Sequence, residues 1–391
     1  MSLYRQEAGG RKPATDAVRR RRVRAGRMLG VLGTLALVGV FPLGGCYYVQ
    51  AINGHTELMR HRRPMTEVLE DPAAPETLKE RLRLVQAART FSVAELGLPD
   101  NDSYRSYADL GRDYVVWNVF AAPEFSLAPR KWCYLVAGCV AYRGYFHKGD
   151  ALEEARALEE DGYDVAMGGV SAYSTLGKFA DPVLNTMMRW SDADLVATLF
   201  HELAHQKLYI KGDTQFNESF ATAVSAIGME RWFATHGASE KLDGYQSERE
   251  LRHELLELVD ATKAKLAALY ASDIPVDEKR ESKRELLDVL SADADELFAA
   301  HGIDGSPLAA PLNNARLVSL GLYEGWASGF RAVYEECAEQ LDCFYARASD
   351  LASLPANERS ARLSLLSMVP EGRRLADSAG GSADAAEGAA D

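Results

Sequence analysis

The sequence predicts an α+β fold in which a few short strands precede a set of long helices. β-Branched and aromatic residues gather in runs typical of strands between residues 115 and 175. From residue 191 onward, apolar residues recur every three or four positions, which is helical spacing. With 391 residues, 47% of them hydrophobic, the chain can build a large core and is not disordered in bulk.

Charge is distributed unevenly along the chain. Residues 1–45 contain nine Lys or Arg and two Asp or Glu, which leaves 35 basic and 55 acidic residues in the remainder. A basic leader before an acidic body is typical of an exported protein. The net charge of −13 excludes a nucleic-acid binder that works by neutralising phosphates.

The leader over 1–45 has the composition of a signal peptide. Six arginines between residues 19 and 27 precede an apolar stretch over 28–43, which is short for a bilayer span of about 20 residues. The segment LGGC, which ends at Cys46, resembles the bacterial lipobox. That resemblance implies cleavage before Cys46 and lipid attachment to it, which tethers the protein to the membrane. Because Tyr47 rather than Asp follows, it also implies the outer membrane, facing the periplasm. An uncleaved anchor helix is the alternative.

The middle of the chain predicts alternating helices and strands. The expected elements are a helix over 75–91, strands over 115–120 and 132–142, a helix over 150–160, and extended segments over 163–167 and 170–175. Asp150 and Glu153 form a capping box that opens the second helix, and Gly168-Gly169 breaks the last extended run.

Two helices follow in close succession. Ser191 and Asp194 form a capping box, and Lys211-Gly212-Asp213 ends the helix that it opens. Asp213 or Thr214 then caps a helix that runs to Phe233.

The later chain predicts a helical insertion and a tail. Leucines at helical spacing over 239–300, interrupted by Asp273-Ile274-Pro275, predict an antiparallel helical hairpin inserted into a domain over 46–370. The composition of 371–391 predicts a disordered acidic tail.

Four cysteines remain besides Cys46. They are Cys133, Cys139, Cys337 and Cys343, which allow three disulfide connectivities or free thiols. The CxxC spacing of zinc sites is absent.

The first predicted helix after residue 191 contains the pattern HExxH. His201 and His205 are four residues apart and therefore share one helix face, where both imidazoles can bind one zinc ion. Glu202 stands beside them as a general base for a water molecule. A catalytic zinc ion has three protein ligands, and Glu218 on the next helix is the expected third.

These residues resemble the gluzincin metallopeptidases, whose third ligand often lies in an Asn-Glu-x-Phe-Ala segment, as in residues 217–221 here. The wider chain resembles the bacterial family of predicted lipoprotein aminopeptidases. Besides the lipobox, the segments that carry this resemblance are 137–140, 142–146, 173–177, 181–184 and 313–316. The resemblance implies a zincin-like peptidase domain with a small sheet and one Zn²⁺.

Several further residues are candidates for substrate contacts. Tyr323 is the expected donor to the oxyanion, with a packed aromatic ring as the alternative. Residues 170–173 could pair with the substrate as an added strand, which makes Tyr173 a candidate for binding the peptide. Asn314 and Arg316 could bind the peptide backbone or have a structural role. Alanyl-type aminopeptidases hold the substrate amine with a Glu in a Gly-x-Met-Glu-Asn segment. Residues 166–170 read AMGGV and have no Glu, so exo- and endo-cleavage both stay open.

The expected function is a zinc-dependent peptidase, an aminopeptidase by resemblance, that acts on peptides and binds no nucleic acid. Two alternatives remain open. One is an endopeptidase that acts on envelope proteins. The other is a non-catalytic, metal-binding envelope lipoprotein. The sequence does not determine the oligomeric state.

Overall fold

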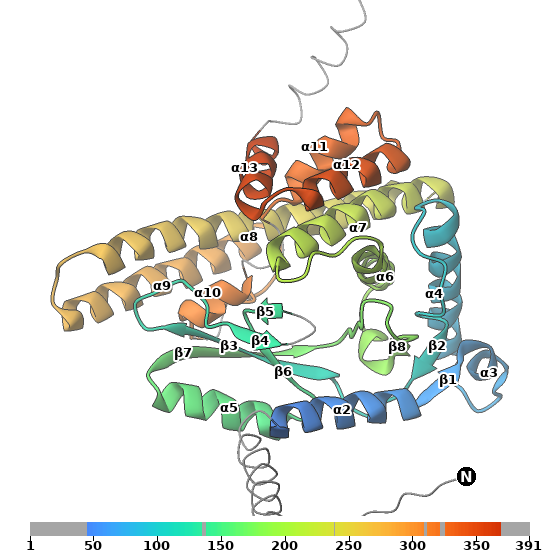
Figure 1. Ribbon diagram of the computed structural model, residues 1–391, viewed down its shortest axis with the longest axis horizontal. Coiled ribbons are helices and arrows are strands. Elements are labelled where there is room, and N and C mark those ends of the chain that lie inside the picture. Colours follow the sequence, from blue (N-terminus) through green and yellow to red (C-terminus); the bar gives the residue numbers. More distant parts are fainter. Residues whose placement is uncertain (1–44, 135–137, 238, 309–310, 321–324, 369–391) are drawn as a thin grey trace, which may run out of the picture. The chain divides into compact units, whose positions relative to one another are not determined.

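The computed structural model describes residues 45–134, 138–237, 239–308, 311–320 and 325–368 (Figure 1). The chain divides into two compact units, residues 1–53 and 54–391. Of the first unit only the N-terminal part of α2 (Gly45–Arg60) is described. Among the described residues, no helix combines the length and the apolar character that crossing a bilayer requires.

Two predictions, for the two ends of the chain, concern residues outside the described ranges. Residues 1–44 of the expected signal peptide and the expected acidic tail over 371–391 lie outside the described residues. The second unit is a mixed α+β structure with small sheets, as the sequence predicts.

The longest strands form a sheet in the order β6-β3-β7. β3 (Val116–Pro123) pairs antiparallel with β6 (Arg143–Tyr145) and β7 (Tyr163–Val170). Both α5 (Lys148–Glu160) and α10 (Asn314–Leu320) pack on β3 and β7, from opposite faces of the sheet (Figure 1). The middle of β3 is buried because both faces of the sheet are covered.

The prediction of a break at Gly168-Gly169 is wrong. β7 runs through both glycines, which pair with Asn118 and Trp117, and residues 171–175 have no regular structure. A Cβ atom on Gly169 would come within 2.3 Å of the Tyr114 ring. Glycine therefore serves close packing of an aromatic ring at this position of the strand.

The predicted single strand over 132–142 is also wrong. β4 (Trp132–Tyr134) and β5 (Gly138–Val140) pair antiparallel, and Cys133 and Cys139 face each other and form a disulfide. Gly138 has a φ of 80°, which L side chains rarely adopt. The chain turns back inside a segment that is apolar and aromatic along its length, so composition does not mark the turn.

The third sheet holds three short strands. β2 (Ser106–Ala108) pairs antiparallel with β1 (Arg62–Pro64) and parallel with β8 (Val183–Leu184). Helices outside the site are α3 (Met65–Glu70), α4 (Glu76–Ala94), the 3-10 helix η1 (Asn185–Met187), α11 (Ala327–Glu336), α12 (Leu341–Ser353) and α13 (Ala356–Ser367). The predicted capping box of α5 does not form, because that helix begins at Lys148.

The helices α6 (Asp192–Lys207) and α7 (Thr214–His236) pack against each other in the main hydrophobic core. Both predicted N-caps are confirmed. The Ser191 hydroxyl accepts a hydrogen bond from Asp194 N at 3.0 Å, and the Asp213 carboxylate accepts one from Phe216 N at 3.1 Å. Both bonds satisfy amide donors that the first turn of a helix leaves unpaired.

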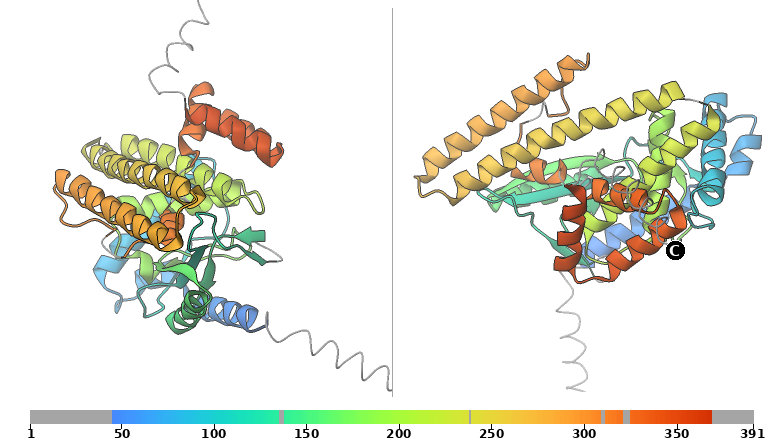
Figure 2. Two further views of the ribbon diagram at one scale, coloured as in Figure 1. Left: turned by 90° about the vertical axis from the view of Figure 1, so that its left-hand side faces the viewer. Right: turned by 90° about the horizontal axis from the view of Figure 1, so that it is seen from above.

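Two long helices, α8 (Ser239–Ala271) and α9 (Val276–Ala300), occupy the region for which a hairpin is predicted. They lie side by side (Figure 2). Leucines on their facing sides form a second core with Leu308 and Leu317, separate from the core around α6 and α7. The hairpin thus has its own hydrophobic support.

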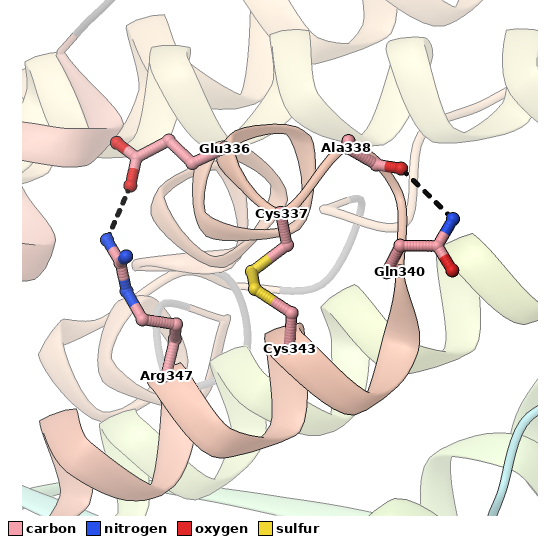
Figure 3. The surroundings of a disulfide bond; sticks show 6 residues. All are labelled: Glu336, Cys337, Ala338, Gln340, Cys343 and Arg347. Carbon is pink, nitrogen blue, oxygen red and sulfur yellow. Dashed lines mark hydrogen bonds and ion pairs between the residues drawn. A yellow bond between two sulfur atoms is a disulfide. The ribbon is translucent and has the colours of Figure 1, made fainter.

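The C-terminal helices hold the start of α7. Arg359 on α13 is buried, and its guanidinium donates to the Asp213 carboxylate at 2.5 and 3.0 Å and to Leu354 O at 2.6 Å. Cys337, at the end of α11, forms a disulfide with Cys343 on α12 (Figure 3). Among the connectivities that the sequence allows, the structure therefore pairs the cysteines within each half of the chain.

We predict that Arg359→Met lowers the free energy of unfolding by about 3 kcal/mol, because it leaves a partly buried carboxylate unpaired. Chemical denaturation measures the change. Arg347→Met is the matched control, since Arg347 pairs with Glu336 at 2.8 Å while both side chains are about half exposed (Figure 3). The control is expected to cost less than about 1 kcal/mol. Equal losses in the two variants would contradict this account.

Candidate metal centre and active site

Three side chains from α6 and α7 converge on one point. His201 and His205 lie one turn apart on α6, and Glu218 lies near the start of α7. His201 Nε2 is 3.2 Å from His205 Nε2 and 3.2 Å from one carboxylate oxygen of Glu218. His205 Nε2 is 3.7 Å from the other carboxylate oxygen. The three side chains can therefore share one ion.

These spacings fit the ligands of a tetrahedral metal ion. Ligand atoms about 2.0–2.1 Å from a tetrahedral Zn²⁺ lie about 3.3 Å from one another. Within the described ranges, this is the one group of three or more His, Cys, Asp or Glu residues that could hold a metal ion. His205 Nδ1 is buried with no hydrogen-bond partner there, so the polar contacts of that ring are at Nε2. The donor set, two imidazoles and one carboxylate, suits Zn²⁺.

The pKa values of His205 and Glu218 favour metal binding, whereas the raised pKa of His201 means that a metal ion must displace a proton from this imidazole. Burial lowers the pKa of His205 to about 4, and the charge of His201 adds to the effect. Burial acts to raise the pKa of Glu218, but the hydrogen bond with His201 and the charges of both histidines lower it overall. Burial also acts to lower the pKa of His201, but Glu218 and Glu202 raise it overall. A neutral His205 and an ionised Glu218 are the forms that bind a metal.

Glu202 follows His201 on α6 and is partly buried. Burial raises its pKa to about 7, and the negative charges of Glu218 and Asp181 act in the same direction. His201 and the Ser174 hydroxyl act to lower it. A carboxyl group with a pKa near 7 can both accept and release a proton at neutral pH.

A buried tyrosine lies near Glu202. Tyr104 is 2% exposed and has a φ of 61°, which is uncommon outside glycine. Its N–H donates to Asp181 O at 2.6 Å, while its buried hydroxyl has no hydrogen-bond partner among the residues described. Burial raises the pKa of this hydroxyl, and the charges of Glu202 and Asp181 raise it further. Tyr104 therefore keeps its proton beside the carboxylate.

The loop that carries Tyr104 is attached to the end of α6. Lys207 donates to Gly97 O at 2.9 Å, and Asn101 donates to Gln206 Oε1 at 2.7 Å. The buried Arg89 guanidinium donates to backbone carbonyls of the same loop. These bonds fix the loop relative to the helix of the HExxH motif.

Asn217 holds the segment that follows α6. Its side chain is 1% exposed, accepts from Ile210 N at 2.7 Å and donates to Ile210 O at 2.8 Å. This places Tyr209 beside the cluster, with its ring edge-on to His205 at 6.4 Å between centroids. Burial and the Glu218 charge raise the pKa of Tyr209. Its side chain is accessible, because the residue is 37% exposed.

The comparisons with known proteins support the resemblance to an aminopeptidase family. A family model described as Putative aminopeptidase matches residues 46–363. The chain belongs to this aminopeptidase family. No curated protein and no solved structure matches the chain. Family membership points to a peptidase. The matched residues include the core around α6 and α7 and the hairpin of α8 and α9.

In this member of the aminopeptidase family, a cavity of about 690 Å³ opens beside His201 and Glu202. Its walls come from α6, α7 and α8, with Phe298 and Ile303 at the end of the hairpin. A cavity of this size can hold several residues of a peptide. The helical hairpin is thus part of the wall of the site as well as a packing element.

The other predicted site residues are not gathered at this cavity. Tyr323 lies outside the described residues, and Cys46 is the second residue of α2. Tyr173 contacts His55 Nδ1 through its hydroxyl at 3.3 Å. Ser171, just before it, is buried and its carbonyl accepts from Thr186, so the segment after β7 is not an open strand edge at that residue.

Asn314 and Arg316 lie on α10. Asn314 is fully buried and donates to Pro123 O and Glu124 O at 3.0 and 2.9 Å, contacts that favour the structural alternative. Arg316 donates to Pro307 O at 3.2 Å, and Pro307 lines the cavity.

The sequence pattern does not single out Tyr104, Asp181 or Tyr209. Asp181 lies in the segment 181–184, which contributes to the family resemblance, but its burial behind the site depends on tertiary packing. Tyr209 lies two residues beyond the end of α6, and its position depends on the contact of Asn217 with Ile210, which the local sequence does not reveal. No local signal marks Tyr104, because its position depends on a long loop.

We predict that Glu218→Ala lowers zinc affinity by at least about 100-fold, since changes to residues that only support a ligand already cost about 10–100-fold. Competition with a chromogenic chelator measures the affinity. Glu153→Ala, an exposed carboxylate on α5, is the control. Unchanged zinc affinity in Glu218→Ala would remove Glu218 from the ligand set.

Proposed function

We propose that the protein is a zinc-dependent peptidase with a zincin-like, gluzincin-type site, and that it acts as an aminopeptidase. The observation that carries the proposal is the convergence of His201, His205 and Glu218 at the spacing of ligands around one ion, with Glu202 beside them at a cavity. Membership of the aminopeptidase family supports a peptide substrate. Three protein ligands leave a fourth position open, which supports catalysis over a purely structural metal.

His201 and His205 would hold the zinc ion through Nε2, and Glu218 through its carboxylate. Zinc at such a site acts as a Lewis acid and lowers the pKa of bound water to about 7. Glu202 would accept the proton of the attacking water and deliver it to the leaving amine. Burial acts to raise the pKa of Glu202, which favours its release of the proton to the leaving amine.

The oxyanion that forms on the substrate requires a hydrogen-bond donor. Tyr323 is the candidate from the sequence, and Tyr209 is a second candidate because it lies beside His205 and is partly exposed. Its raised pKa keeps the hydroxyl protonated, and therefore able to donate, across neutral pH.

We predict that Glu202→Gln retains zinc and lowers kcat by about 1,000-fold or more, because the amide cannot accept the proton. Hydrolysis of a panel of peptides with free and blocked N-termini measures the change. Wild-type activity on free N-termini alone would support the aminopeptidase assignment, and activity on both would favour an endopeptidase.

The Glu153→Ala variant serves again as the control, with unchanged kcat expected. A chelator should abolish wild-type activity, and added Zn²⁺ should restore it. Full hydrolysis by Glu202→Gln would overturn the role of Glu202 as the base.

We also propose that the protein is an envelope lipoprotein with its lipid attached to Cys46. The support is the LGGC segment that ends at Cys46, directly ahead of the family match, which begins at residue 46. We predict that Cys46→Ala abolishes labelling with a fatty-acid analogue and releases the protein from the membrane or leaves it unprocessed. Normal lipid labelling of this variant would contradict the lipobox assignment.

A further inference from the structure

The wall of the cavity that α8 provides is basic near the metal centre. Arg249 and Arg252 both line the cavity that reaches His201 and Glu202. They are three residues apart on one helix and therefore lie on the same face, about 5–6 Å apart at Cβ.

Arg249 has no acidic partner among the residues that the structure describes. Arg280, Arg331 and Arg359 each form an ion pair with a carboxylate. Within the part of the chain that the structure describes, Arg249 forms no such pair, and its guanidinium lies over the Tyr245 ring at 6.0 Å from the centroid. Stacking on a ring restricts the side chain and leaves the edge of the guanidinium free to donate hydrogen bonds.

Arg252 lines the same cavity as His201. Its charge is one of the influences that lower the pKa of His201, after the larger effect of burial. The two arginines are therefore about 4.5 Å apart along the axis of α8, on a wall of the cavity that His201 also lines. One or two residues of an extended peptide span that distance, at about 3.3–3.6 Å each.

We propose that Arg249 and Arg252 bind a carboxylate of the substrate, so that the enzyme prefers peptides with an acidic group one or two residues from the scissile bond. This inference rests on the proposed peptidase function. A guanidinium donates two parallel hydrogen bonds to a carboxylate, a geometry that an amide of the same size does not match. The carboxylate can come from an Asp or Glu side chain or from the C-terminus of a short peptide.

The carboxylates around the cavity explain why a basic pair matters for an acidic substrate. Glu202, Glu248 and Asp194 also line the cavity, and Glu218 lies next to His201. These carboxylates would repel an acidic peptide, and the repulsion grows as water is excluded. Arg249 and Arg252 offset this repulsion locally, next to Glu248 on the same helix, and thereby determine where along the cavity an acidic group can lie.

The test uses Ala-Ala-Ala-Ala and variants of it with Asp or Asn at the second, third or fourth position, each with a free or an amidated C-terminus. For the wild-type protein loaded with zinc, we expect KM to be about tenfold lower for Asp than for Asn at one position, or for the free than for the amidated C-terminus. The Asp comparison identifies a side-chain carboxylate, and the amidation comparison identifies a terminal one.

Three variants on α8 separate the role of charge from that of folding. Arg249→Gln should raise KM for the acidic peptide about tenfold and leave kcat and the KM of the Asn peptide within about twofold. Arg249→Lys retains the charge and should restore part of the preference. Lys265→Gln removes an exposed charge from the same helix away from the cavity and should change nothing.

Binding supplies a second readout that does not depend on turnover. Calorimetry with the zinc-loaded Glu202→Gln protein should show the same preference for the acidic peptides, and Glu202→Gln/Arg249→Gln should lose it. Equal KM and equal binding for acidic, neutral and amidated peptides would overturn the carboxylate site while the peptidase function stands. Selective binding without hydrolysis by the wild type would retain the carboxylate site and overturn the peptidase function. Absence of both binding and hydrolysis would overturn both.

Discussion

The close packing of α6 on α7 is the constraint on which the candidate site depends. A Cβ atom on Gly228 of α7 would come within 2.7 Å of the Phe200 ring on α6, so this glycine allows the two helices to approach. The short distance brings Glu218 to the imidazoles of α6. Asn217 and Asp213 then fix the first turns of α7, through Ile210 and Arg359 respectively. A shift of one helix along the other would separate the three ligand atoms.

Polar groups that are expensive to bury surround this helix pair. Tyr104 combines a left-handed backbone, which costs about 1–3 kcal/mol, with a buried hydroxyl that has no partner among the described residues. Arg89, Asn101 and Lys207 hold the surrounding loop through backbone carbonyls and the side chain of Gln206. Strain of this kind persists where the structure around it is over-determined, and it tends to occur at functional sites. Its location next to Glu202 agrees with that tendency.

Local patterns predicted much of the helical structure and of the candidate ligand set. The caps at Ser191 and Asp213 depend on the sequence within one turn, and the spacing of His201 and His205 follows from helical periodicity. The structural roles of Gly138, Gly168 and Gly169 do not follow from the local sequence. The first allows a reversal inside an apolar segment, and Gly169 accommodates the Tyr114 ring within a continuous strand. Long-range packing determines which of these meanings a glycine has, as it determines the positions of Tyr104 and Asp181.

The hairpin of α8 and α9 has a core of its own, while the cluster of His201, His205 and Glu218 rests on the core around α6 and α7. The part of α8 from Leu255 onward is therefore held by the leucines of the hairpin, whereas Leu242 and Tyr245 near its start pack against the core around α6 and α7. Substitutions in the second half of α8 can therefore be absorbed within the hairpin without disturbing the packing of α6 on α7.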